Sequence, residues 1–208
     1  MKLARRIYCI EGHWDYGDRE VEPSVEPILQ LMANMDLWPS YGRRDCATKQ
    51  ELQFFLGEEW YRRCEEQSVL YLATHGWDGG ITLSEGQDVP LEELAGYLEP
   101  DGAEGCLVHF SGCEVMKAKE SQLRDFMART KAAAISGYTK EAGWTSALEA
   151  GVRGAPALAL ELLLFSTLKT QAIDLRDGRS FGRLHPLAAD LRKRFPDCGF
   201  KLRTRPPK

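Results

Sequence analysis

The 208-residue sequence lacks any segment that would place it in a membrane. Its most apolar stretch, 155–168, is too short to span a bilayer and contains Glu161. The start of the chain has only a short apolar run, broken by Glu11 and His13, which does not fit a secretory signal peptide. We therefore expect a cytoplasmic protein with no membrane partner.

The sequence also lacks the cysteine patterns of metal and disulfide proteins. Its six cysteines form no CxxC pair and have no regular spacing, which argues against a zinc site and a disulfide framework. We expect no metal, no cofactor, and thiols that are mostly reduced and buried. The cysteines are Cys9, Cys46, Cys64, Cys106, Cys113 and Cys198.

No repeat, low-complexity tract or Pro/Ser-rich linker divides the chain. With 43% hydrophobic and 28% charged residues, the composition is that of a globular protein, and we expect one domain over 1–208. The net charge is −4, but residues 51–104 carry 13 acidic side chains against only two arginines. This acidic stretch surrounds His75. It would attract a basic polypeptide and repel nucleic acid, unless it is simply a solvated helix face.

Apolar runs and helical patterns alternate along the chain, which predicts an α/β fold with a mostly parallel sheet of about six strands and helices on both faces. Two of the predicted strands, 68–74 and 106–110, are nearly continuous apolar runs, as expected for strands covered on both faces. We predict further extended segments at 6–12, 38–46, 132–138 and 200–202, and helices at 25–35, 49–66, 89–98, 120–130, 145–169 (interrupted at 151–156) and 186–195.

Two chemically reactive residues follow the two clearest strands. His75 ends one and Cys113 ends the other, and reactive groups of parallel sheets collect at the carboxyl ends of the strands. Histidine can serve as the base that a thiol needs to become a nucleophile near neutral pH. A glycine beside the histidine, Gly76, would let its N–H and that of Cys113 form an oxyanion hole.

The residues around this pair resemble the CHAT family, a group of caspase-related peptidases. Leu70–Gly76 (LYLATHG) is similar to the family's histidine strand, and Leu107–Glu114 (LVHFSGCE) is similar to its cysteine strand, with Gly112 in place of a common alanine. Ile81–Leu83 and Leu91–Leu94 resemble its two linking elements. The resemblance covers about residues 68–150.

The resemblance implies a caspase-like sheet and cleavage of a protein substrate by a Cys113/His75 dyad through an acyl-enzyme. It also implies a setting such as bacterial defence or cell death. The long repeat or sensor regions often attached to CHAT domains are missing, so regulation would come from a partner protein or a homodimer. The alternatives are a catalytically silent scaffold or sensor partner, and a nucleic-acid-binding regulator that uses the basic tail, 192–208.

Caspase-related enzymes resemble one another in carrying a charged S1 residue at the end of the first strand and beside the position two before the cysteine. Those places fall on Glu11, with Asp15 nearby, and on Ser111. A carboxylate there would favour Arg or Lys at the cleavage site, although Glu11 is equally read as an exposed strand-end residue. Asp78 lies in a predicted rim loop, where it could hold a basic side chain or be a plain loop acid. We expect His109 to be a hydrogen-bonded interior residue.

Overall fold

A six-stranded sheet forms the centre of the computed structural model, which describes residues 6–13, 24–38, 40–63, 67–100, 102–141, 155–176 and 181–205. Its strands are β1 (Arg6–Glu11), β2 (Tyr41–Asp45), β3 (Gln67–Ala73), β7 (Leu107–Phe110), β8 (Ala134–Tyr138) and β9 (Phe200–Thr204). They lie in the order β2-β1-β3-β7-β8-β9. All neighbours are parallel except β9, which pairs antiparallel with β8 at one edge.

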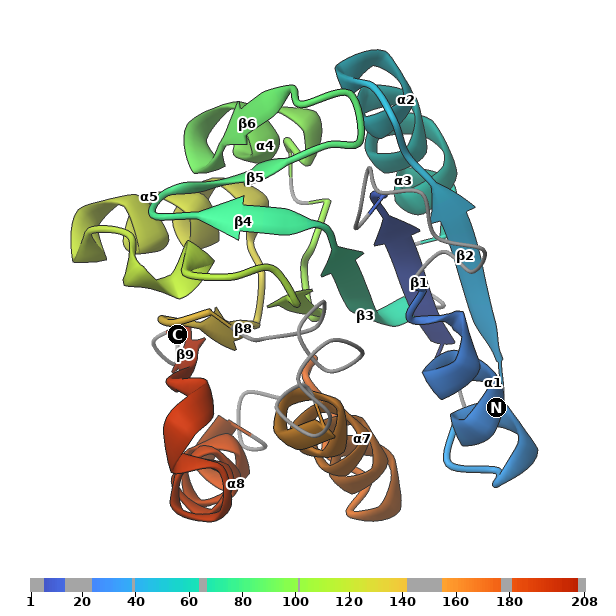
Figure 1. The fold of residues 1–208 in the computed structure, drawn as a ribbon, viewed down its shortest axis with the longest axis vertical. Helices are drawn as coiled ribbons and strands as arrows, with labels where there is room; N and C mark the ends of the chain where they lie inside the picture. The colour runs from blue at the N-terminus through green and yellow to red at the C-terminus, as the bar shows by residue number, and fades with distance from the viewer. Residues whose placement is uncertain are drawn as a thin grey trace.

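Helices cover both faces of this sheet (Figure 1). One face carries α1 (Glu26–Asn34), α7 (Ala155–Thr170) and α8 (Phe181–Arg194). Alternate residues of each strand point to it, and Tyr71 and Ala73 of β3 join its buried core with Leu160 and Leu164 of α7. The predicted α/β class is confirmed, and the arrangement is consistent with a caspase-like fold.

The opposite face carries a helical segment that begins at Lys49 and two further helices. Thr48 caps this segment and forms a capping box with Glu51, as the Thr-x-x-Glu spacing allows. Leu70 and Leu72 of β3 belong to the core of this face. The elements are α2 (Lys49–Phe54), the π-helix η1 (Phe55–Trp60), α3 (Tyr61–Arg63), α4 (Leu91–Tyr97) and α5 (Glu120–Thr130).

A small antiparallel sheet lies between β3 and β7 in the chain. It consists of β4 (His75–Trp77), β5 (Gly80–Thr82) and β6 (Asp88–Pro90). Figure 1 shows it lying over the carboxyl end of β3 and beside α4. Pro90 ends β6 and is the N-cap of α4, so the helix predicted at 89–98 begins two residues later than expected.

The last part of the chain shows the largest boundary difference. Pro186 lies inside α8, which begins at Phe181 and not at the predicted Pro186. A proline inside a helix is normally disfavoured, but buried Leu184 and Leu187 continue one apolar stripe through this position. The strand predicted at 200–202 is confirmed as the antiparallel edge strand β9. The part of the helix predicted at 145–154 lies outside the described residues.

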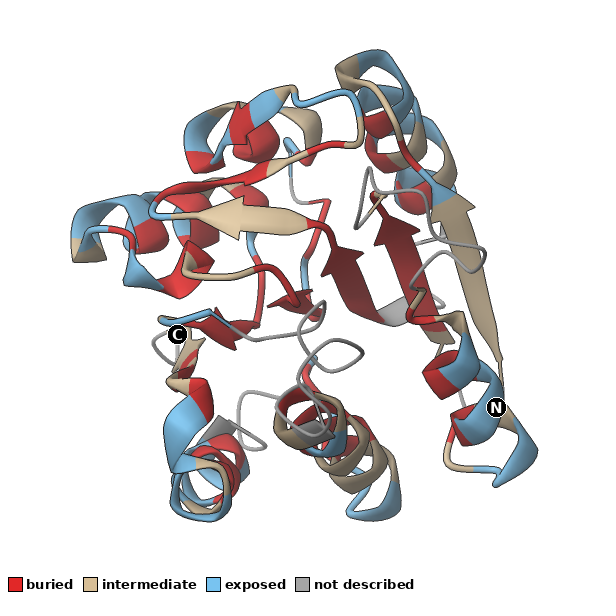
Figure 2. Ribbon diagram, viewed as in Figure 1, coloured by how far each residue is buried: buried red, intermediate tan, exposed pale blue. Residues whose placement is uncertain are grey.

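Two 3₁₀ turns, η2 (Val115–Lys117) and η4 (Pro196–Cys198), complete the described elements. Figure 2 shows β1, β7, β8 and the described part of β3 mostly buried, while exposed residues lie on the outer sides of the helices. None of the described helices is long and apolar enough to cross a membrane.

A pair of leucine substitutions tests this core. Leu72 in β3 is fully buried, whereas Leu31 in α1 is 44% exposed. We expect Leu72→Ala to lower the free energy of unfolding by about 2–5 kcal/mol, because it removes packed atoms and leaves a cavity. The control Leu31→Ala is expected to change it by less than about 1 kcal/mol. Urea unfolding measures both, and equal effects would contradict the assignment of β3 to the centre of the sheet.

Candidate active site

The strands β3 and β7 are neighbours in the main sheet and end beside each other. Their last paired residues are Leu72 and Phe110. The N–H of Ser111 continues the pairing by donating to the carbonyl of Leu72 at 2.9 Å. His75 lies three residues after Leu72, and Cys113 lies three residues after Phe110. The predicted histidine and cysteine therefore leave the sheet at the same level of two adjacent strands.

The two chain segments meet through their glycines. A β-carbon built on Gly76 would lie 2.5 Å from the carbonyl oxygen of Cys113. One built on Gly112 would lie 2.7 Å from the carbonyl oxygen of Thr74 and 3.0 Å from the amide nitrogen of Gly76. Such distances are too short for any side chain, so backbone packs directly on backbone here. This contact brings together the backbone segments that carry His75 and Cys113.

Access to solvent distinguishes Cys113 from the other described cysteines. His75 and Cys113 are both partly exposed. Burial raises the pKa of the Cys46 thiol to about 12, and it also raises the pKa of Cys9 and of Cys198. Because the thiolate is the reactive form, these buried thiols are poor nucleophiles at neutral pH. The described cysteines other than Cys113 are all buried: Cys9, Cys46, Cys106 and Cys198.

The backbone turns sharply directly after the cysteine. Glu114 has φ 57°, a left-handed conformation that non-glycine residues rarely adopt. Two hydrogen bonds hold this turn: the Glu114 N–H donates to the Lys140 carbonyl at 3.2 Å, and the Lys117 N–H donates to the Glu114 carbonyl at 2.8 Å. Backbone conformations of this kind gather at functional sites. The turn follows β7, which ends at Phe110, and comes directly after Cys113.

The chemistry that this arrangement can perform is acyl transfer. The two adjoining backbone segments carry a thiol, an imidazole and the N–H of Gly76, the groups used for nucleophilic attack, proton transfer and oxyanion binding. Within the described ranges, no group of three or more His, Cys, Asp or Glu side chains is arranged to hold a metal ion.

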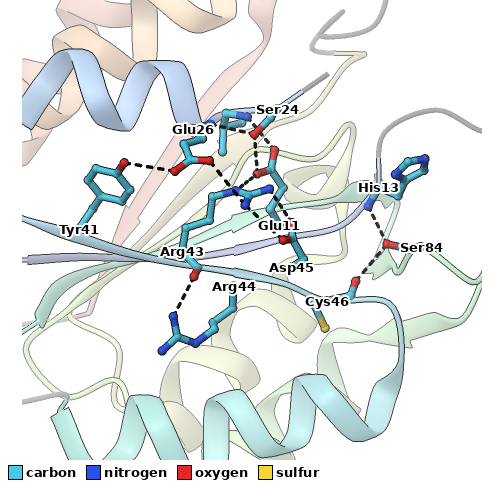
Figure 3. Close-up of polar contacts among 11 residues, drawn as sticks. Glu11, His13, Ser24, Glu26, Tyr41, Arg43, Arg44, Asp45, Cys46 and Ser84 are labelled. Carbon is cyan, nitrogen blue, oxygen red and sulfur yellow. Dashed lines mark hydrogen bonds and ion pairs between the residues drawn. The ribbon is translucent and has the colours of Figure 1, made fainter. Parts of the chain in front are cut away.

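Glu11 has a structural role that the sequence does not reveal (Figure 3). It is 2% exposed, and its carboxylate forms an ion pair with Arg43. It also accepts hydrogen bonds from the Ser24 hydroxyl at 2.9 Å and from the Val25 N–H, at the start of α1, at 2.7 Å. Glu11 thus joins β1, β2 and α1. It is not an exposed strand-end residue, and its charge is already balanced by Arg43.

A cavity of about 250 Å³ lies at the carboxyl ends of β1 and β2. Gly12 connects it to the histidine segment, because its N–H donates to the carbonyl of Ala73 at 2.9 Å and a β-carbon built on it would lie 3.4 Å from the Thr74 side chain. The lining carries three acidic side chains, Glu11, Asp45 and Glu51, against Arg43. The N–H groups of residues 47 and 48 hold the pKa of Glu51 below its usual value, so this carboxylate is ionised at neutral pH.

The other predicted substrate-binding residues lie in different surroundings. Ser111 is fully buried and donates to Glu161 at 2.8 Å, so in this conformation it cannot contact a substrate side chain as predicted. Asp78 is exposed in the turn after β4. The pKa of Lys117 is raised mainly by its hydrogen bond to Glu114, and the charge of Asp78 adds to this effect. Asp15 lies outside the described residues.

A buried polar cluster beneath the site was not anticipated. The sequence predicts a core helix over 155–168, and the structure places the carboxylate of Glu161 at the centre of the sheet's α7 face with no exposure. The only signal for it is a single acid in an otherwise apolar run. His109 is confirmed as a hydrogen-bonded interior residue: its Nδ1 lies 2.7 Å from Ser136 Oγ and its Nε2 lies 3.0 Å from Glu161.

A family model described as a family of unknown function, DUF6642, matches residues 4–150. The chain belongs to that family. The matched range includes Glu11, His75 and Cys113 and ends before α7. The search of curated proteins found no match. The family description assigns no activity to its members, so the chemistry of this DUF6642 chain must be argued from its own residues.

Two glycine substitutions test the contact between the two segments. We expect Gly112→Ala to lower the free energy of unfolding by about 1–3 kcal/mol, because its methyl group would collide with backbone atoms. The control is Gly57→Ala in η1, where a β-carbon meets no atom within 4 Å. This control should be neutral or slightly stabilising, since alanine favours a helix more than glycine does. Thermal unfolding measures the stability of both variants. A Gly112→Ala protein as stable as the wild type would contradict the close backbone packing.

Proposed function

We propose that the chain is a caspase-like cysteine endopeptidase that cleaves a protein substrate with Cys113 as nucleophile and His75 as general acid and base. The observation that carries this proposal is the backbone contact of Gly76 with Gly112 and Cys113, since it joins the ends of two adjacent parallel strands. The sheet order, with its antiparallel edge strand, and the partial exposure of both residues support it further.

The first half of the reaction forms an acyl-enzyme. The Cys113 thiol gives its proton to His75, and its sulfur attacks the carbonyl carbon of the scissile peptide bond. The negative charge that develops on the carbonyl oxygen is stabilised by the N–H groups of Gly76 and Cys113. The imidazolium then protonates the leaving amine, the C–N bond breaks, and a thioester remains on Cys113.

The second half of the reaction releases the enzyme. His75 takes a proton from a water molecule, which attacks the thioester carbonyl and forms a second tetrahedral intermediate. The C–S bond breaks, the carboxylic product leaves, and Cys113 recovers its proton from the imidazolium. The pair is chemically sufficient, and a third side chain is not required.

We propose a preference for Arg or Lys at the cleavage site. The support for this is the cavity next to the histidine segment, where three carboxylates face one guanidinium. Arg43 forms ion pairs with both Glu11 and Asp45, so these two carboxylates share one guanidinium, and Glu51 adds a third negative charge to the lining. A cationic side chain entering the cavity would be attracted to that charge.

The proposed setting is the cytoplasm, with activation by a partner protein or a second copy, in a role such as bacterial defence or cell death.

Affinity labelling tests the dyad and its specificity together. The purified protein is treated with peptidyl chloromethyl ketones that carry Arg, Asp or Leu at P1, and modified residues are located by mass spectrometry. We expect modification of Cys113 at least about tenfold faster with P1 Arg than with the other two, because a charge-assisted contact contributes over about 1.4 kcal/mol. His75→Ala should abolish the reaction.

The buried thiols serve as internal controls for this experiment. With a pKa of about 12, Cys46 is ionised in roughly one molecule in 10⁴ at pH 8, so it should stay unmodified. Equal modification of Cys113 by all three reagents would exclude the basic preference. Slow and equal modification of every cysteine, unchanged in His75→Ala, would exclude the dyad and favour a catalytically silent scaffold or sensor.

A further inference from the structure

Glu161 of α7 presents its carboxylate to the main sheet. It is fully buried, and its two oxygens contact four polar groups. One oxygen faces three of these groups and the other faces Tyr71. The contacts are to the Tyr71 hydroxyl at 2.5 Å, the Ser111 hydroxyl at 2.8 Å, His109 Nε2 at 3.0 Å and the Tyr138 hydroxyl at 3.0 Å.

Three of the groups lie in the consecutive strands β3, β7 and β8, and the fourth, Ser111, directly follows β7. Two of those strands carry the proposed dyad at their ends: Tyr71 lies four residues before His75, and Ser111 lies two residues before Cys113. Register pairs Phe110 with Gly137, so Tyr138 lies beside Ser111 on the next strand. A single helical side chain thus connects the ends of the strands that hold both reactive groups.

Packing alone does not explain a carboxylate at this position. The rest of the buried side of α7 is apolar, with Leu160, Leu164 and Phe165 in the core. A charged group removed from water is strongly unfavourable unless it is hydrogen-bonded, whereas an apolar side chain of similar size would fill the same space. What the carboxylate adds is geometry, because four directional bonds fix its partners relative to one another.

The cluster also reaches the cysteine. Burial, and next the charge of Glu161, raise the pKa of Tyr71 and of Tyr138, so both hydroxyls stay protonated and act as donors. Cys113 itself packs against the buried core that contains Tyr71 and Tyr138. Through Ser111 the cluster is also joined to the cysteine by two residues of backbone.

We propose that Glu161 is a positioning residue that holds Cys113 and His75 in reactive alignment by bonding to β3, β7 and β8 at once; the inference rests on the proposed function. It touches neither the substrate nor the reacting atoms. Its removal should therefore slow the chemical step and leave substrate binding in the cavity near β1 and β2 unchanged.

The experiment compares Glu161→Gln with Leu164→Ala, a matched variant from the same helix in which a fully buried side chain without polar contacts is truncated. Inactivation by the P1 Arg chloromethyl ketone is followed at several reagent concentrations, which separates the limiting rate from the half-saturating concentration. We expect Glu161→Gln to lower the limiting rate of Cys113 modification about 10- to 100-fold with the half-saturating concentration within about twofold. Leu164→Ala, measured well below its unfolding temperature, should change neither.

Ser111→Ala is a second variant that keeps the carboxylate and removes one of its bonds, in case Glu161→Gln fails to fold. It should lower the same limiting rate several-fold. Equal limiting rates for the wild type and both cluster variants would overturn the inference and leave the proposed function intact. A decrease of the same size in Leu164→Ala would overturn it too, since the effect would then be general loosening. A wild-type protein that is not modified at Cys113 would instead overturn the proposed function, and the inference with it.

Discussion

The contact between two short backbone segments is the constraint on which the site depends. Gly76 lies against Cys113, and Gly112 lies against Thr74 and Gly76, at distances that leave no room for a β-carbon. Parallel pairing of β3 with β7 brings the two segments to one edge of the sheet, and the glycines let them approach until backbone meets backbone. The small sheet begins at His75 and packs on the face of the main sheet that α4 and α5 cover.

Two buried carboxylates stabilise the surroundings of this contact from the side of α1 and α7. Glu11 connects β1 to Arg43 on β2 and to the start of α1, and Glu161 connects α7 to β3, β7 and β8. Glu11 points from the end of β1 into this face, whereas Glu161 points from α7 towards the sheet, and each accepts bonds from several groups. Together they tie the covering helices to the strand ends, where a loss of alignment would matter most for chemistry.

Periodicity alone was sufficient to predict most of the fold. The apolar runs that became β3 and β7 are long and nearly uninterrupted, and α5 has the predicted bounds because its pattern and flanks agree. Short-range patterns were less informative where tertiary packing determines the helix boundary. Pro186, for example, lies inside α8, because the buried apolar stripe of that helix extends to both sides of the proline. The positions of His75 and Cys113 followed from their strands, whereas the partners of Glu11 and Glu161 come from distant segments that no local pattern records.

The most direct test of the account is whether Cys113 forms a thioester with an acyl group that a substrate delivers. The protein is mixed with a P1 Arg peptide p-nitrophenyl ester, nitrophenol release is followed, and the protein mass is measured. The account predicts a burst of nitrophenol equal to the enzyme concentration and an acyl adduct on Cys113 that hydroxylamine removes, both absent in Cys113→Ser and His75→Ala. Nitrophenol release without a burst or adduct, at the same rate in all three proteins, would contradict it.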